Sequence, residues 1–150
     1  MGGGKMYSKN FWTAILTGGI AVNLLDVVVR GGVLKDVFIT NATEPRTDID
    51  PAWFVLFGFL KIVIYVWFFY KTRQSFGGGA RGGLKFGFYY GIALNVPAMF
   101  FPYMVYKGVP YHFIWISIAY GLAWAMTLGV IVGKVADWPY GKNGAATLRQ

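Results

Sequence analysis

The chain contains no cysteine and only one histidine in 150 residues. Without cysteine it has no disulfide framework, thiol nucleophile or thiolate metal site. Because His112 is the single histidine, it cannot supply both axial ligands of a bis-histidine haem. No catalytic triad, H-E-x-x-H motif or pair of carboxylates is visible. We therefore expect no enzyme activity, no bound metal and no other cofactor. The sequence leaves open whether His112 ligates a pigment or simply lies at an interface.

Charge is also scarce, at 13% of residues against about 25% in ordinary soluble domains. Hydrophobic residues make up 56% and aromatic residues 19%. Four apolar segments, at residues 11–34, 52–70, 84–106 and 111–134, approach or exceed the roughly 20 residues of a spanning helix. The sequence predicts an all-α integral membrane protein, a four-helix transmembrane bundle forming one domain over residues 1–150. A large soluble helical core is the alternative, and four long runs with so little charge disfavour it.

The net charge of +8 would suggest nucleic acid as a partner in a soluble protein, but its distribution fits a membrane topology. In a four-span chain, only four cations would lie on one side, namely Arg30, Lys35, Arg46 and Lys107. Nine would lie on the other, namely Lys5, Lys9, Lys71, Arg73, Arg81, Lys85, Lys134, Lys142 and Arg149. We therefore predict cytoplasmic termini, contact with the lipid bilayer and no binding of nucleic acid.

Polar residues within the apolar segments are the candidates for function, because ionisable groups are costly there. Asn23, Asp26 and Arg30 fall on one face of the first segment at helical spacing. Asp26 is its only acid, and Lys61 interrupts the second segment. We predict that Asp26 pairs with Lys61 between two helices, with Arg30 nearer the outer surface. The pair is interpreted either as a structural contact, costing about 3–5 kcal/mol to break from one side, or as an ion relay or ligand site.

Small residues recur every four positions in the third and fourth segments, which predicts close packing between these two helices. The third segment also contains Pro97 and Pro102, which are expected to kink it. The first stripe runs through Gly83, Gly87, Gly91 and Asn95, and the second through Ser117, Gly121, Ala125, Gly129 and Gly133.

A short internal echo links Gly19–Asn23 with Gly91–Asn95, which agree at four of five positions. If it reflects a duplicated hairpin, Asn23 and Asn95 would face each other and line a small polar cavity. Chance similarity between apolar segments explains the echo equally well, in which case both amides are simple interhelical hydrogen-bonding groups.

The connections give further expectations. The glycine-rich, basic stretch at residues 71–85 is expected to be a flexible cytoplasmic turn. Asp50 before Pro51 predicts an N-cap followed by proline at the first helical position. Asp48 and Asp50 together could bind a cation only weakly.

The polar pattern around Asn23 and Asp26, followed by Asn41-Ala42-Thr43-x-Pro45-Arg46 and Asp50-Pro51-Ala52-Trp53, resembles small four-span bacterial membrane proteins without an assigned activity. The resemblance implies a bacterial inner membrane location and transfers no catalytic residue. We expect an accessory or structural subunit that associates with other membrane proteins or with itself. The alternative is a small transporter or ion-coupled carrier using Asp26, Lys61 and the two asparagines.

Overall fold

The computed structural model describes residues 9–37, 50–105 and 109–138. The described elements are α1 (Lys9–Val28), the π-helical turn η1 (Val29–Val33), α3 (Pro51–Phe76), α4 (Gly79–Val105) and α5 (Tyr111–Ala136). All of these elements are helical, which confirms the all-α prediction. Two helical segments, Lys9–Val33 and Tyr111–Ala136, are long and apolar enough to cross a membrane.

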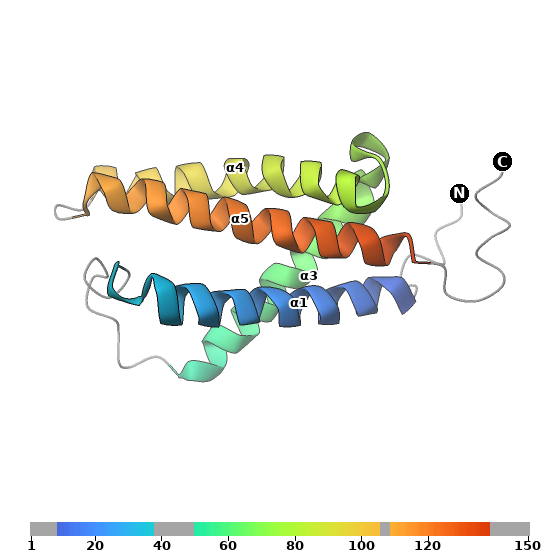
Figure 1. The fold of residues 1–150 in the computed structure, drawn as a ribbon, viewed down its shortest axis with the longest axis horizontal. Helices are drawn as coiled ribbons and strands as arrows, with labels where there is room; N and C mark the ends of the chain where they lie inside the picture. Colours follow the sequence, from blue (N-terminus) through green and yellow to red (C-terminus); the bar gives the residue numbers. More distant parts are fainter. Residues whose placement is uncertain (1–8, 38–49, 106–108, 139–150) are drawn as a thin grey trace, which may run out of the picture.

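The four long helices form two layers that cross at an angle. Helices α4 and α5 lie side by side and antiparallel, α1 runs along α5, and α3 crosses the other three obliquely (Figure 1). Helix α1 begins and α5 ends at the same end of the bundle, where α3 also meets α4 (Figure 1). Because α3 is oblique, only its second half packs into the core, where Ile62, Tyr65, Val66 and Phe69 are buried.

The tightest contact in the described chain is between α4 and α5. A Cβ atom added to Gly83 would overlap the carbonyl oxygen of Gly129, and one added to Gly129 would overlap the carbonyl of Gly83. A Cβ at Gly87 would similarly meet the backbone of Ala125. The small residues therefore let two helix backbones touch, and dispersion between main chains holds them together.

An aromatic cluster fastens α3 to this pair. Tyr65 and Phe69 are fully buried, and both pack edge-on against Phe86 of α4 at ring-centroid distances of 5.1 and 5.3 Å. The Tyr65 hydroxyl donates a hydrogen bond of 2.7 Å to the carbonyl oxygen of Ala125 in α5. One side chain thus links three helices, because its ring is held by α4 and its hydroxyl by α5.

The expectation of a flexible turn over residues 71–85 is wrong. Helix α3 continues to Phe76 and α4 begins at Gly79, so only Gly77 and Gly78 connect them. Gly77 and Gly79 have φ angles of 82° and 67°, a region that favours glycine. The glycines that follow are held in the helix by packing against α5 and against the turn itself, which outweighs their poor helix propensity.

The structure also bears on the expectations for α4 at its prolines and for the start of α3. Helix α4 runs without a break through Pro97 and Pro102. The N-cap prediction for α3 is confirmed, since the backbone N–H of Ala52 donates to Asp50 Oδ1 at 2.8 Å and Pro51 opens the helix. The motif at residues 41–46, together with Asp48, lies outside the described residues.

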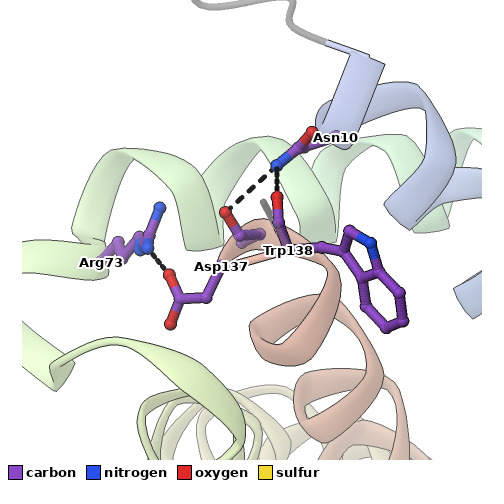
Figure 2. A network of polar contacts seen from close by, with 5 residues as sticks. Asn10, Arg73, Asp137 and Trp138 are labelled. Atoms are coloured by element: carbon purple, nitrogen blue, oxygen red, sulfur yellow. Dashed lines mark hydrogen bonds and ion pairs between the residues drawn. The ribbon is translucent and has the colours of Figure 1, made fainter. Parts of the chain in front are cut away.

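A polar clasp, made of Asn10, Arg73 and Asp137, ties three helix ends together (Figure 2). Arg73 near the end of α3 forms an ion pair with Asp137, which directly follows α5. Asn10 in the first turn of α1 donates hydrogen bonds to the carbonyls of Ala136 and Trp138, at 3.4 and 3.0 Å. The clasp fixes the end of the bundle at which α1 begins and α5 ends.

Replacing Asp137 by asparagine should lower the free energy of unfolding by less than about 1 kcal/mol, because both partners of the ion pair are partly exposed. Denaturant unfolding followed by circular dichroism measures the change. Asp36→Asn is the matched control, because Asp36 is an exposed residue just after η1. A loss several times larger would show that the clasp is a principal support of the bundle.

Candidate functional site

Four of the five polar residues singled out in the sequence meet at one cavity of about 650 Å³. Asp26 and Arg30 reach it from α1 and η1, Lys61 from α3 and Asn95 from α4. The rest of the lining is mostly aromatic and aliphatic and comes from α4 and α5, with Val109 just before α5. The volume lies within the range of about 300–1,000 Å³ typical of small-molecule sites.

Asp26 is held by two neighbours. Its Oδ1 accepts a hydrogen bond from the Tyr120 hydroxyl and lies 3.8 Å from Arg30 Nε. The Arg30 guanidinium carbon is also 5.0 Å from the centroid of the Tyr120 ring. Arg30 therefore contacts the same site as Asp26, and at 55% exposed it is the more accessible of the two. The one-turn widening at η1 places Arg30 in a π-helical turn, a feature that recurs at functional sites.

The predicted ion pair between Asp26 and Lys61 is not formed. Lys61 Nζ instead lies 3.9 Å from the centroid of the Trp124 ring, a cation–π contact. The physical reason is competition, since Asp26 is already engaged by a hydroxyl and a guanidinium. Nor is the Asp26–Arg30 pair buried, because the two side chains are 38% and 55% exposed. Among the described residues, no carboxylate is within ion-pair distance of Lys61.

Asn23 and Asn95 make the same local bond but do not share a site. Each side-chain amide donates to the carbonyl four residues earlier, Asn23 to Gly19 at 2.7 Å and Asn95 to Gly91 at 2.8 Å. Asn95 then lies against Gly121 and lines the cavity, whereas Asn23 is exposed on α1 and does not. The expectation that the two amides face each other is therefore wrong.

Ser117 is the least expected member of the lining. It is 8% exposed, and its hydroxyl has no hydrogen-bond partner. Helical Thr13 and Thr17, by contrast, each donate to the carbonyl four residues earlier, at 2.8 and 2.7 Å. A buried hydroxyl without a partner is unfavourable and requires an explanation. The oxygen atom is itself enclosed by protein atoms, so the hydroxyl is not open to the cavity that the residue lines.

The sequence reasoning missed Tyr120 and Trp124 as site residues. The signal that would have found them is the spacing along α5, because Ser117, Tyr120 and Trp124 are separated by three and four residues and so share one helix face. Two predicted packing residues, Gly121 and Ala125, also line the cavity. The other three, Gly87, Gly91 and Gly129, lie in the contact between α4 and α5.

His112 lies exposed in the first turn of α5. Within the described ranges, no three histidine, aspartate or glutamate side chains gather in a way that could hold a metal ion.

No protein family, curated protein or solved structure matches this chain. The chemistry of the cavity is therefore the guide to function.

Replacing Ser117 by alanine should leave the stability of the ligand-free protein unchanged or raise it by up to about 1 kcal/mol, because it removes an unsatisfied buried hydroxyl and improves helix propensity. Thermal unfolding of the purified protein measures this, with Ser75→Ala on the exposed end of α3 as the control. A clear loss of stability at Ser117 would mean that the hydroxyl is already bonded in the ligand-free state.

Proposed function

We propose that the chain is a four-span integral membrane protein, with α1, α3, α4 and α5 as its spans. Support comes from the outward faces of all four helices, which expose large apolar side chains in contiguous groups. Soluble monomers rarely expose apolar patches of this extent. Examples are Leu16, Ile20 and Leu24 on α1, Phe57 and Ile64 on α3, Ile92 and Phe101 on α4, and Trp115 on α5.

The orientation proposed is with both termini in the cytoplasm. The end of the bundle closed by the clasp also carries most of the described basic residues, which favours the cytoplasmic side. These residues are Lys9, Lys71, Arg73, Arg81, Lys85 and Lys134.

Single-cysteine labelling tests both statements directly, because the native chain has no cysteine to remove. A membrane-impermeant maleimide applied to intact cells should label His112→Cys and Lys35→Cys. It should label Ser75→Cys only after the membrane is permeabilised. If only α1 and α5 cross, the connection between α3 and α4 stays outside, and Ser75→Cys is labelled in intact cells.

For activity, we infer that the protein binds a small amphiphilic molecule in the cavity and acts as a carrier for it. The observation that carries this proposal is the cavity itself, with the ammonium of Lys61 on its wall. Lys61 is exposed and has no carboxylate within ion-pair distance among the described residues, so its charge is available to a bound molecule.

The cavity residues have different roles in the proposed binding. Asp26, Arg30 and Tyr120 form a mutually bonded group that gives one wall a fixed shape. Lys61 supplies an exposed positive charge on the cavity wall. Carriage also requires a wall that moves, and the adjoining glycines of η1 have no neighbour within 4 Å that would oppose a bend.

Native mass spectrometry of the protein purified in a mild detergent tests this proposal. The wild-type chain should retain a small molecule, and Ser117→Leu, which fills the cavity, should lose it. Ala119→Leu, two residues along α5 on its exposed face, is the matched control and should retain it. Met99→Trp, with Ala98→Trp as its control, repeats the test from α4 in case the first variant does not fold.

Flux separates carriage from binding alone. The retained molecule should cross the membrane of liposomes that contain the wild-type protein. It should not cross the membrane of liposomes that contain the Ser117→Leu variant. Retention without flux would make the protein a binding protein rather than a carrier.

A second candidate function, that of an accessory subunit, is favoured by the first half of α3. There four large exposed side chains share one helix face, since they stand at helical spacing, and they are Trp53, Leu56, Phe57 and Leu60. Phe59, on another face, is also exposed. A photo-crosslinking residue at position 57 should capture a protein partner in native membranes if this half-helix contacts one, and lipid alone if it does not.

A further inference from the structure

We propose that the molecule bound in the cavity is a single-chain carboxylic acid, whose carboxylate pairs with Lys61 above the Trp124 ring and whose chain runs along α5 toward Ser117. The inference rests on the proposed binding role of the cavity and assigns the chemical class of its ligand.

The charge of the ligand follows from the cavity wall. Two cations, Arg30 and Lys61, and one carboxylate, Asp26, line it. The carboxylate is engaged by Arg30 and by the Tyr120 hydroxyl, so the charge left without a counterion is the ammonium of Lys61. Lys61 is exposed and lines the cavity, so its ammonium is open to a bound molecule, and one negative charge on the ligand would pair with it. A monoanion therefore fits, and a cation or dianion does not.

The position of the anion is set by Trp124. The indole ring lies under Lys61 Nζ at 3.9 Å and holds the ammonium on one side. The hydrogens of the ammonium that do not face the ring remain available to a carboxylate, because a lysine ammonium has three donors. A carboxylate placed there gains a charge-assisted hydrogen bond without displacing the cation–π contact.

The length of the ligand follows from α5. Ser117 lies seven residues before Trp124 on the same helix face, about 10 Å away along the axis. Between and beside them the lining includes Leu94, Met99 and Ile114. An extended hydrocarbon chain matches this path.

The volume of the cavity favours a ligand with a single hydrocarbon chain. About 650 Å³ is in the range of cavities that enclose small molecules, which argues for a free acid rather than a two-chain anionic lipid. A free acid and an anionic lipid both present a negatively charged group, so the experiment tests each of them.

Direct binding of radiolabelled decanoate to the protein in nanodiscs of neutral phosphatidylcholine tests the proposal. Replacing Lys61 by glutamine should weaken binding about tenfold or more, as expected for loss of a charged hydrogen bond. Lys61→Arg should keep most of the affinity. Lys71→Gln, on the exposed end of the same helix, is the matched control and should bind as the wild type does. Equal binding by wild type and Lys61→Gln overturns the proposal.

Competition by analogues of equal length checks the head group. Decanol and decylamine should not displace decanoate, because they lack the negative charge. The direction of the chain is checked with Ser117→Leu, which fills the cavity at Ser117 and should weaken the binding of decanoate more than that of butanoate. If both acids lose affinity equally, the chain does not run toward this residue and the proposed direction is wrong.

Nanodiscs that contain phosphatidylglycerol separate the two sources of the acid. If this lipid displaces decanoate from the wild type, the occupant is an anionic lipid and the single-chain assignment falls. If decanoate binding does not depend on Lys61, but Ser117→Leu still strips a retained molecule, the cavity binds another class of ligand and the proposed function stands. If nothing is retained and decanoate does not bind, both proposals fail.

Discussion

Replacing Gly83 by alanine should lower the free energy of unfolding by about 2 kcal/mol or more, because the added methyl group has no room between two helix backbones. The atoms that it would meet are the carbonyl of Gly129 and the Cα of Gly133, which cannot turn aside as a flexible side chain can. Relief requires α4 and α5 to separate along their shared face. Unfolding of the purified protein in detergent, followed by circular dichroism, measures the loss.

The matched control for this experiment is Gly58→Ala. Gly58 lies inside α3 with nothing within 4 Å of an added Cβ. The same substitution there should raise the free energy of unfolding by about 0.5–1 kcal/mol, since alanine is the better helix former. The two substitutions are chemically identical and opposite in expected sign. Equal effects at the two positions would show that α4 and α5 do not approach as closely as described.

Replacing Tyr65 by alanine should cost about 3 kcal/mol, at the lower end of the range for removing a buried aromatic side chain. The ring is fully buried and packs on the rings of Phe86 and Tyr90 at 5.1 and 4.8 Å, so its loss leaves a cavity among three helices. The lower end applies because unfolded helices in detergent or lipid remain in apolar surroundings, which reduces the transfer part of the cost.

Two further variants separate packing from hydrogen bonding at this position. Tyr65→Phe keeps the ring and loses only the bond to the Ala125 carbonyl, so it should cost about 0.5–1.5 kcal/mol. Tyr89→Ala removes a tyrosine from α4 that is 61% exposed and should have little effect. If Tyr65→Phe proves as damaging as Tyr65→Ala, the hydroxyl rather than the ring fastens α3 to the bundle.

Local features of this protein could be predicted from neighbours in the chain. The apolar runs predict helices because each is about as long as a membrane-spanning helix, and the cap at Asp50 follows from the order of Asp50 and Pro51. The four-residue spacing of glycines puts Gly83, Gly87 and Gly91 on one helix face. The same reasoning failed at residues 71–85, where glycine content suggested a loop and contact with α5 keeps the backbone helical.

The contacts within the site could not be predicted from the spacing of residues in the sequence. Four of its polar residues were visible as charges or amides in apolar segments, because such groups are rare there. The residues that contact them could not be recognised, because Tyr120 and Trp124 are two aromatic residues among many in this sequence. Only the packing of α5 against α1 and α3 brings Tyr120 to Asp26 and Trp124 to Lys61.

The sequence by itself determined the helices, their apolar surfaces and the small-residue stripes, since these depend on periods of three to four residues. The tertiary structure alone decided that α3 crosses obliquely, that Asp26 binds Tyr120 and Arg30 rather than Lys61, and that a cavity remains among the four helices. The physical reason is that pairing between helices depends on their crossing geometry. A side chain takes whichever partner that geometry brings nearest.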